Sequence, residues 1–324
     1  MTILITGFSG FVAQYFVEYL DNLDEEWSVI GVDINAPKYD YSCYRHLKSV
    51  EFTELNLLHS DALNVFFKKN TPDYILHLAS FSSVAYSWEH PEESFLNNTN
   101  IFLNLVNAIQ RYNPACRILS VGSSEEYGNV PHDNLPIREN EPLGPLSPYA
   151  VARVAQEQLS RVFHVSSGLN IIMTRSFNHI GPRQDDRFVV PSFIKRILAI
   201  RDQGKTEGEI ETGDISIIRD FVDVRDVIRA YYILLKEGRA GEVYNICAGR
   251  RISLEMLIGM IAKLAGVSVK PVVNPAFVRP NDNKEIVGSY YKIESEFGWK
   301  PEIELEQTLR DMVDFYEKKN NGGG

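Results

Sequence analysis

A serine, a tyrosine and an arginine are the side chains of this sequence best suited to chemistry. Ser123 stands in the segment Gly122–Gly128, and Tyr149 is followed four residues later by Arg153. On a helix, residues at i and i+4 share a face, so the phenol and the guanidinium would lie together. A fixed cation stabilises a phenolate, and a serine hydroxyl opposite would orient a carbonyl or alcohol between them. The pattern predicts proton transfer that accompanies hydride exchange with a nicotinamide.

Residues 1–15 indicate the fold that would hold such a cofactor. This matters because a tyrosine–arginine pair alone is more often a surface contact. An apolar run typical of a buried strand is followed by Gly7 and Gly10, and a helical pattern begins at Phe11. This turn lets backbone N–H groups and the helix N-terminus approach a pyrophosphate. Ala13 stands where a third glycine often serves helix–strand packing, which a single methyl group still allows.

The second predicted strand, residues 27–33, ends in Asp33. A carboxylate at that position accepts the hydroxyls of an adenosine ribose and repels a 2′-phosphate. No arginine follows directly, because residues 34–37 are Ile, Asn, Ala and Pro. The sequence therefore favours NAD(H) over NADP(H) as the cofactor.

Strands and helices alternate regularly through the first half of the chain. Strands are predicted at 3–5, 27–33, 50–55, 73–79, 117–121 and 170–174, and helices from residue 11 and at 60–69, 91–111 and 148–165. Such alternation predicts an α/β fold with right-handed βαβ crossovers and a doubly wound parallel sheet of the Rossmann type.

Beyond Arg175 the alternation lapses. Helices are predicted at 187–201, 224–235, 253–264 and 305–316, and one further strand at 241–246. We expect an NAD-binding Rossmann domain over residues 1–177, to which 216–250 return. We expect a smaller substrate-binding lobe from 178–215 and 251–319, placed over the strand C-termini, where such sheets bind ligands. Residues 320–324 are predicted to form a flexible tail.

The composition is that of an ordinary globular protein. The chain has 324 residues, 44% of them hydrophobic and 23% charged, and a formal net charge of −10, which argues against nucleic-acid binding. No apolar run is long enough to cross a bilayer, and Met1 leads straight into the first strand, so we expect no signal peptide, no membrane association and a cytoplasmic location. Three scattered cysteines suit neither a disulfide framework nor a metal site.

Taken together, these motifs resemble the extended short-chain dehydrogenase/reductase family, whose members act on nucleotide sugars. Within that family, the motifs are most similar to those of the GDP-4-keto-6-deoxymannose reductases and, less closely, to those of the GDP-mannose 4,6-dehydratases. The resemblance covers nearly the whole chain and rests on the segments Thr6–Ala13, His77–Ala79, Gly122–Gly128, Ser147–Tyr149, Arg175–Pro182, Phe188–Pro191, Arg219–Asp226, Arg279–Pro280 and Gly298–Pro301, with Asp33 and Asn98.

The resemblance implies a catalytic set. Ser123 and Tyr149 match the hydroxyl pair that holds and protonates the sugar oxygen. Arg153 departs from the family, which normally has a lysine that bonds the nicotinamide ribose, and we expect slower hydride transfer or a shifted pH optimum from this change. Glu125 matches the glutamate that removes a proton in the dehydratases. The reductases can retain it, and it could equally serve only as a loop hydrogen-bonding group.

Binding residues are implied in the same way. His77 lies inside an apolar run and is interpreted as a core histidine, while Ile101 replaces the glycine that usually follows the family asparagine. Cofactor contacts are expected at Gly7, Gly10, Phe11, Val12, Asp33, Ile34, Asn56, Leu57, Leu78, Ala79, Ser80, Asn98, Val121, Tyr149, Arg153 and Ser176. Substrate contacts are expected at Ser82, Ser83, Ser124, Glu125, Asn178, Phe188, Val189, Arg219, Arg279 and Asp282, the arginines on phosphate and Asp282 on the guanosine ribose.

These inferences predict an NAD(H)-dependent enzyme that reduces the C4 keto group of a GDP-4-keto-6-deoxy-hexose. Alternatives are a GDP-mannose-type 4,6-dehydratase, a C4 dehydrogenase or epimerase on a related GDP-hexose or heptose, and a non-catalytic NAD-sensing or scaffold protein on the same fold. Helices 91–111 and 148–165 carry apolar residues beyond one stripe, among them Leu105, Val106, Leu159 and Val162. The family equivalents form a four-helix interface, so we expect a homodimer.

Overall fold

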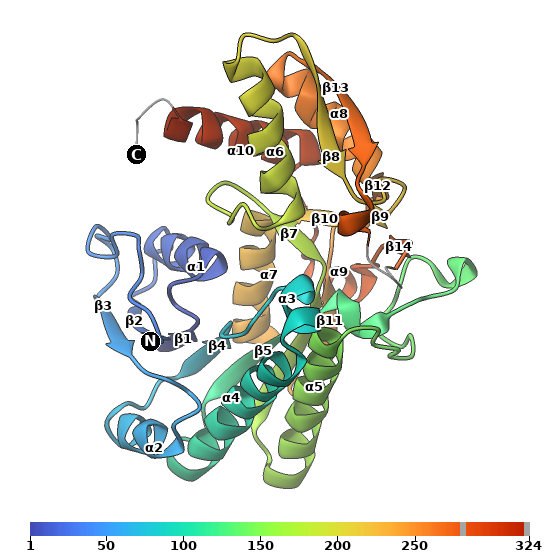
Figure 1. Cartoon of the computed structure of the whole chain (residues 1–324). Coiled ribbons are helices and arrows are strands. Elements are labelled where there is room, and N and C mark those ends of the chain that lie inside the picture. Colours follow the sequence, from blue (N-terminus) through green and yellow to red (C-terminus); the bar gives the residue numbers. More distant parts are fainter. Residues whose placement is uncertain (279–282, 321–324) are drawn as a thin grey trace.

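A seven-stranded sheet organises the molecule (Figure 1). The structure is a computed structural model that describes residues 1–278 and 283–320. The strand order is β11-β6-β5-β4-β1-β2-β3, and every pair is parallel. The chain moves outward from β1 to β3 and then returns to build β4, β5 and β6 on the other side, which confirms the doubly wound sheet. The strands are β1 (Thr2–Thr6), β2 (Ser28–Asp33), β3 (Ser49–Glu54), β4 (Tyr74–His77), β5 (Arg117–Ser123), β6 (Asn170–Ser176) and β11 (Val243–Ile246).

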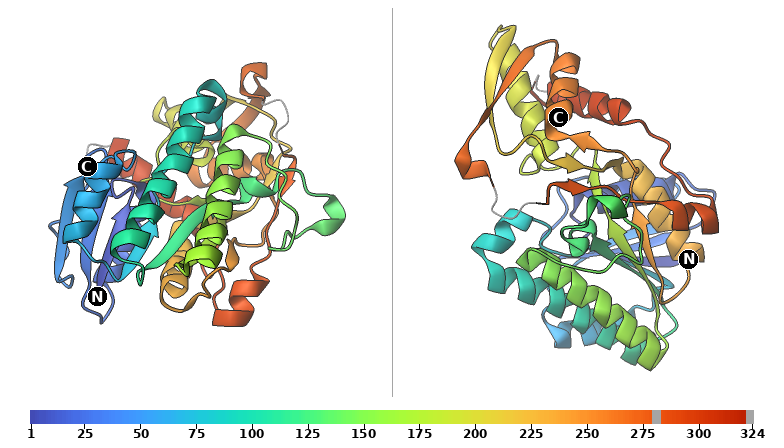
Figure 2. Two further views of the ribbon diagram at one scale, coloured as in Figure 1. Left: turned by 90° about the horizontal axis from the view of Figure 1, so that it is seen from below. Right: turned by 90° about the vertical axis from the view of Figure 1, so that its right-hand side faces the viewer.

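Helices cover both faces of this sheet (Figures 1 and 2). One face packs against α1 (Phe11–Asp21) and α7 (Val224–Glu237), and the other against α2 (Ser60–Lys69), α4 (Pro91–Tyr112) and α5 (Pro148–Ser167). Successive residues of β1 point to opposite faces, so that Ile3 and Ile5 join the first core and Leu4 joins the second. Two buried faces explain why this strand reads as an unbroken apolar run.

A third core lies in the C-terminal lobe, defined here by α6 (Val189–Asp202), α8 (Leu254–Ala265) and α10 (Leu305–Asn320), at the top of Figure 1. Beside these helices β8 (Glu207–Thr212) pairs in parallel with β13 (Ser268–Val273). The other described elements are α3 (Val84–Glu89), β7 (Asn178–Ile180), β9 (Ile218–Arg219), β10 (Phe221–Asp223), β12 (Ile252–Ser253), β14 (Glu285–Ile286), α9 (Tyr291–Phe297), and the 3-10 turns η1 (Ser124–Tyr127), η2 (His132–Asn134) and η3 (Pro275–Phe277).

Several predicted boundaries shift in the structure. Helix α6 begins at Val189 and not at Arg187, because Phe188 takes an extended N-cap conformation. Helix α8 begins one residue later than predicted, after Ser253, which caps the helix by accepting a hydrogen bond from Met256 N at its Oγ, at 3.0 Å. Helix α10 continues through Asn320, so the predicted tail starts one residue too early. The short strands β7 to β10 and helix α3 were not predicted, because such brief elements carry little periodicity.

Helices α4 and α5 lie side by side on the outside of the sheet (Figure 2). The expectation that Leu105 and Val106 lie outside the core stripe is wrong, since both are fully buried beneath α4. Val162 is exposed, and Leu159 packs against the core. Within residues 1–278 and 283–320, no helix is both long enough and apolar enough to cross a membrane.

Candidate active site

Ser123 ends β5 at the carboxyl edge of the sheet, and the turn η1 that follows holds it in place. Glu126 Oε1 accepts a hydrogen bond from Ser123 N at 2.7 Å, and Ser123 Oγ accepts one from Glu125 N at 3.2 Å. The two residues thereby cap the turn reciprocally. A Cβ on Gly122 would lie 2.5 Å from both Glu126 Oε1 and Thr174 O, so only glycine lets this carboxylate lie under the strand.

Tyr149 and Arg153 lie on the buried face of α5, as their spacing predicted. The helix begins with Ser147, whose Oγ accepts a hydrogen bond from Ala150 N at 3.1 Å, and with Pro148 at its first position. Tyr149 is 7% exposed and Arg153 5%. The guanidinium carbon of Arg153 lies 5.2 Å from the centroid of the Tyr149 ring. The structure therefore places a buried cation against the phenol.

Arg153 is held by neutral groups. Its Nη1 donates to Gln156 Oε1 at 2.7 Å and to Val121 O at 3.2 Å. Gln156 in turn donates from Nε2 to Ser120 Oγ at 2.8 Å and to Val121 O at 3.1 Å. These bonds tie the helix that carries Tyr149 to the strand that carries Ser123. The sequence prediction included Val121 but missed Gln156, which has no distinguishing signal beyond its position on the same helix face as Arg153.

A second arginine, Arg175 on β6, packs against α5 one residue beyond Gln156, at Glu157. Its Nε and Nη2 each donate to the carboxylate of Glu157 at 2.8 Å, and both side chains are nearly inaccessible. Its guanidinium carbon lies 4.7 Å from the centroid of the Tyr127 ring, and the Tyr127 hydroxyl donates to Asn245 Oδ1 at 2.6 Å. This ion pair joins α5 to the sheet beneath the site.

Glu126 is an unusual carboxyl in this environment. It is fully buried, and its Oε2 has no hydrogen-bond partner among the described residues. Burial, and then the nearby charge of Glu157, raise its pKa to about 8, against the opposing effects of Arg175 and Arg153. Glu126 was not among the predicted site residues. The sequence signal was present, because a second acid directly follows Glu125 in the turn after a predicted buried strand.

The glycine turn after β1 has the shape that a dinucleotide site needs. Gly7 has a φ of 72°, and a Cβ there would lie 2.8 Å from Ala79 N. Gly10 N donates to Gly7 O at 3.0 Å, and α1 begins at the next residue, Phe11. Leu78 and Ala79 lie against Gly7, so the predicted contacts from two strands converge here. A backbone turn without side chains at a helix N-terminus fits a pyrophosphate.

Asp33 ends β2 beside that turn. Its Oδ2 accepts a hydrogen bond from Ser9 N at 3.0 Å, and its Oδ1 accepts one from Ile34 N at 2.7 Å. The carboxylate therefore holds the glycine turn against the second strand. Ile34 is exposed. Asn56 caps its own turn, with Oδ1 accepting from Leu58 N at 2.9 Å, and Leu57 beside it is buried.

Two other predicted cofactor residues have structural partners. The amide of Asn98 is bonded to the backbone of Phe81 through both of its ends, at 2.8 and 3.2 Å. Asn98 therefore positions the loop after β4, which contains Ser80, Ser82 and Ser83. Ser176 Oγ lies 2.7 Å from the hydroxyl of the buried Tyr231.

His77 is a core histidine, as predicted. Its Nδ1 lies 2.8 Å from Thr6 Oγ1, and burial lowers its pKa to about 3, helped by the charge of Arg153. The ring is therefore neutral and is no general base at ordinary pH.

Four of the predicted substrate residues of the second half lie on or beside β7, β9 and α6. Arg219 is buried, and its Nη1 donates to Asn283 O at 2.7 Å and Ile218 O at 3.0 Å. Asn178 is half-buried on β7, and Phe188 and Val189 are partly exposed at the start of α6. Ser124 is buried within η1. Arg279 and Asp282 lie outside the described residues.

Asp220, next to Arg219, fixes the backbone beneath this region. Its carboxylate accepts hydrogen bonds from Ala248 N, Gly249 N and Gly288 N at 3.0, 2.9 and 3.1 Å. Burial raises its pKa to about 6, although these N–H groups oppose the shift. The carboxylate joins three separate segments, so we interpret it as structural.

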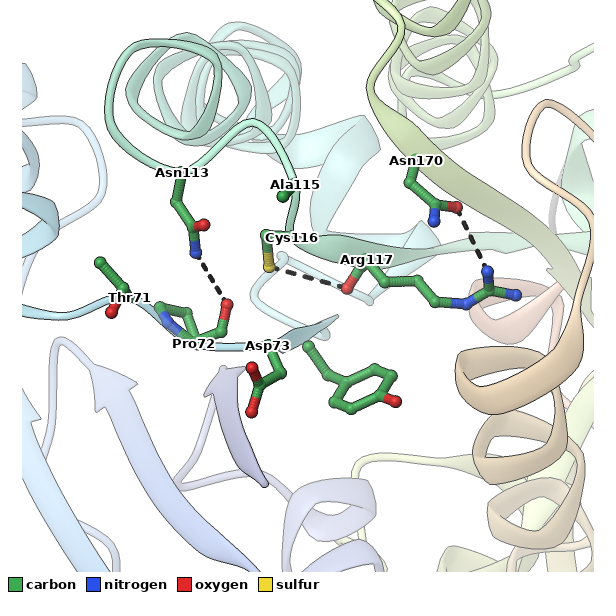
Figure 3. Close-up of a pocket in the computed structure, with 9 residues that line it drawn as sticks. Thr71, Pro72, Asp73, Asn113, Ala115, Cys116, Arg117 and Asn170 are labelled. Carbon is green, nitrogen blue, oxygen red and sulfur yellow. Dashed lines mark hydrogen bonds between the residues drawn. The ribbon is translucent and has the colours of Figure 1, made fainter.

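A hollow of about 330 Å³ lies at the opposite edge of the sheet (Figure 3). It is lined by the first residues of β4, β5 and β6 and the loops before them, including Asp73, Asn113 and Arg117. Asn113 Nδ2 donates to Pro72 O at 2.7 Å, and Arg117 Nη1 to Asn170 Oδ1 at 3.5 Å. Ser123 ends β5 at the other edge, so this hollow is remote from the site.

Known proteins share both the sequence and the fold. A protein of Pseudomonas aeruginosa named GDP-6-deoxy-D-mannose reductase is 33% identical over 317 residues, which cover 98% of this chain and 97% of that protein. The dTDP-glucose 4,6-dehydratase of Haemophilus influenzae is 27% identical over 337 residues, with 98% of each chain covered.

Among solved structures, that of RMD from Pseudomonas aeruginosa complexed with NADPH matches with a TM-score of 0.84 at 32% identity, covering 98% of this chain and 99% of that one. That of the UDP-glucose 4-epimerase of Thermotoga maritima with UDP-glucose matches with a TM-score of 0.87 at 30% identity, covering 99% and 100%.

Together with these relatives, the Rossmann sheet and the glycine turn identify the chain as an extended short-chain dehydrogenase/reductase, a nucleotide-sugar oxidoreductase that uses NAD(P). Residues 4–312 match the GDP-mannose 4,6-dehydratase family. The chain belongs to that family.

Proposed function

We propose that this enzyme reduces the C4 keto group of a GDP-4-keto-6-deoxy-hexose. The observation that carries the proposal is the buried Tyr149–Arg153 pair beside the Ser123 strand, in a chain 33% identical over nearly its whole length to a protein named GDP-6-deoxy-D-mannose reductase. The GDP-mannose 4,6-dehydratase of Yersinia enterocolitica is only 27% identical to this chain. The higher identity to the reductase, 33%, favours reduction over dehydration.

In the proposed reaction Ser123 Oγ donates a hydrogen bond to the keto oxygen, while its own lone pair accepts from Glu125 N. Tyr149 transfers its phenolic proton to that oxygen as the carbonyl becomes an alcohol, and Arg153 stabilises the phenolate that remains. A reduced nicotinamide supplies the hydride when it is bound at the Gly7 turn. Asn178, Arg219 and Arg279 hold the diphosphate, and Asp282 the ribose.

When GDP-4-keto-6-deoxymannose is supplied, the enzyme should consume one NADH or NADPH for each sugar reduced. The product should be a GDP-6-deoxy-hexose that carries a hydroxyl group at C4. The Tyr149→Phe variant should lose about 10³-fold in kcat while binding the cofactor normally. If GDP-mannose without any added cofactor is instead converted to the 4-keto-6-deoxy sugar, the enzyme is a dehydratase. Glu125 on η1 matches the dehydratase glutamate and is the reason to test for dehydratase activity. If that activity is present, Glu125→Gln should abolish it without affecting keto reduction.

We propose NAD(H) as the preferred cofactor. Support comes from Asp33, whose carboxylate already binds Ser9 N at the glycine turn and would repel a 2′-phosphate there. The structure of RMD from Pseudomonas aeruginosa contains NADPH, so the KM values of this enzyme for NADH and NADPH need to be compared directly. We expect a lower KM for NADH than for NADPH. Asp33→Ser should decrease the ratio of the KM for NADPH to the KM for NADH, or bring it below one. The matched variant Asp61→Ser, on α2, should leave it unchanged. A lower KM for NADPH in the wild type would refute the preference.

We also propose a homodimer formed by α4 and α5 of two copies. Exposed apolar side chains on these helices and on the adjoining α3 support it: Trp88, Phe95, Leu96, Val151, Val162 and Val165. Light scattering at micromolar concentration should report a dimer, and Val151→Glu should convert it to a monomer. A monomeric wild type would contradict this proposal.

A further inference from the structure

We propose that Gln156 is a positioning residue of this enzyme, which holds the Arg153 guanidinium beside Tyr149 while leaving its charge uncancelled. The inference rests on the proposed function, in which Tyr149 transfers the proton. Gln156 is 1% exposed and lies one helical turn beyond Arg153 on the same face of α5. Its amide oxygen accepts from Arg153 Nη1 at 2.7 Å, the shorter of the two bonds described for that nitrogen.

The surroundings determine how the amide of Gln156 is oriented. Val121 O lies 3.1 Å from Gln156 Nε2, and a carbonyl oxygen can only accept hydrogen bonds. The nitrogen must therefore face Val121 O and Ser120 Oγ, which leaves the amide oxygen facing the guanidinium. The opposite orientation would set N–H groups against a guanidinium, which carries only donors. Gln156 is thus a fixed acceptor for Arg153.

The charge of Arg153 remains largely uncompensated at neutral pH. The titratable groups that act on it from the elements packed around it are His77 on β4, Glu126 on η1, Tyr149 on its own helix and Tyr231 on α7. The pKa of His77 is lowered to about 3 and that of Glu126 raised to about 8, in both cases mainly by burial, so both groups are neutral at pH 7. Burial also raises the pKa of Tyr231 well above its ordinary value.

A glutamine suits this position because it orients without neutralising. The next residue, Glu157, shows the alternative, since its carboxylate pairs with Arg175 through two hydrogen bonds. A carboxylate at position 156 would cancel the field that favours the Tyr149 phenolate. An apolar side chain would leave the guanidinium tethered only by Val121 O. Gln156 thereby acts on the reaction through Arg153, and its amide is bonded to Arg153, Ser120 and Val121.

The test compares Gln156→Glu and Gln156→Leu with the control Ser160→Ala, in the full-length enzyme. Ser160 is buried one turn farther along the helix, and its hydroxyl donates to the backbone oxygen of Gln156 at 2.9 Å and to Ser120 Oγ at 3.2 Å. It contacts neither the Gln156 amide nor Arg153 among the described hydrogen bonds. Keto reduction requires protonated Tyr149, so its rate falls as the phenol ionises at high pH. Gln156→Glu should move this alkaline limb upward by about one pH unit. Gln156→Leu should lower kcat about tenfold with KM for the sugar little changed, and Ser160→Ala should do neither.

A double-mutant cycle shows whether the effect runs through Arg153. In an Arg153→Met background, adding Gln156→Leu should change kcat by less than about twofold, because the group that it positions is gone. Independent multiplication of the two losses would overturn the proposal, as would an alkaline limb that Gln156→Glu leaves in place. Should Gln156→Leu fail to fold, the near-isosteric Gln156→Glu still decides.

A substrate-free measurement separates this proposal from the proposed function. Tyrosinate absorbance is titrated in each variant, with the same variant carrying Tyr149→Phe as the blank. The Gln156→Glu change should displace the Tyr149 transition to higher pH. If the wild type reduces no 4-keto sugar but this displacement is observed, the reductase assignment fails and the positioning role stands. If reduction is observed without the displacement, the positioning role fails.

Discussion

Two buried arginines, Arg153 on α5 and Arg175 on the neighbouring strand β6, have opposite electrostatic settings. Both guanidinium groups lie near a tyrosine ring, Arg153 at 5.2 Å from Tyr149 and Arg175 at 4.7 Å from Tyr127. Arg175 is paired with the carboxylate of Glu157 at 2.8 Å. Within the part of the chain that the structure describes, Arg153 has no such carboxylate and is bonded to an amide and a backbone oxygen. The difference separates a cation used for structure from one kept available for chemistry.

The pKa directions follow the same division. Burial opposes the charged forms of Arg175 and Glu157, but their mutual hydrogen bonds and charges outweigh it, so the pKa of the arginine is raised and that of Glu157 is lowered. Each stabilises the ionised form of the other. Around Arg153 burial prevails, and Glu126 and His77 are held neutral at pH 7. A positive charge next to neutral groups is what a phenol needs if it is to lose its proton.

The largest expected effect is on stability, at the Arg175 end. Glu157→Gln leaves the buried Arg175 without its counter-charge and should lower the free energy of unfolding by about 3–5 kcal/mol, measured by urea denaturation. Glu209→Gln removes an exposed carboxylate 3.0 Å from Lys270 and should change it by less than about 1 kcal/mol. An equal decrease in the free energy of unfolding for the two variants would contradict the structural role of the Arg175–Glu157 pair.

At the other end, Arg153→Met should lower kcat about 10²-fold, because the Tyr149 phenolate loses its cation. Its cost in unfolding free energy should be only about 1 kcal/mol, since no charge is left unpaired. Gln156 Oε1 loses its donor, while Val121 O still accepts from Gln156 Nε2. Arg161→Met, on the same helix but partly exposed, should leave kcat near wild type. A stability loss as large as that of Glu157→Gln would show that Arg153 is also structural.

The carboxyl of Glu126 is affected by the charges of both arginines, and Gly122→Ala tests its packing. The added methyl would meet Glu126 Oε1 and Thr174 O at 2.5 Å, so we expect a loss of about 2 kcal/mol in unfolding free energy. Displacement of Glu126 would also release Ser123, so kcat should fall with it. Gly259→Ala provides the control, because nothing lies within 4 Å of the new Cβ on α8 and alanine favours a helix. No loss in Gly122→Ala would show that the turn can adjust.

The last prediction concerns the pH dependence of stability. Because burial raises the pKa of Glu126 to about 8, the folded protein binds a proton that the unfolded chain releases near pH 4.3. The stabilisation that this proton provides is complete below the unfolded pKa and is lost as the pH rises through about 8. The Tm of Glu126→Gln relative to wild type should therefore increase between pH 5 and pH 9. Exposed Glu207→Gln should show a flat difference, and a flat difference for Glu126→Gln would mean that Glu126 is ionised in the fold.

Much of this site could be predicted from local patterns. The i, i+4 spacing put Tyr149 and Arg153 on one face, and the strand–glycine–helix order placed Gly7 at a dinucleotide turn. Both depend only on the regular geometry of a helix or a turn, which neighbouring residues set. Asn98 shows where such reasoning stops. Its contact with the cofactor stays a prediction, and no local pattern indicated that its amide is bonded to the backbone of Phe81, in the loop after β4.

The doubly wound sheet, the glycine turn and the order of serine, tyrosine and arginine along the chain could all be predicted from the amino-acid sequence, because periodicity and turn chemistry are local. The surroundings of each charge became known only from the folded structure. Leu105 and Val106 became core residues, and Glu126 became a buried neutral acid. Whether a charge survives depends on groups that approach from other strands and helices, and their distances are set by packing rather than by position in the sequence.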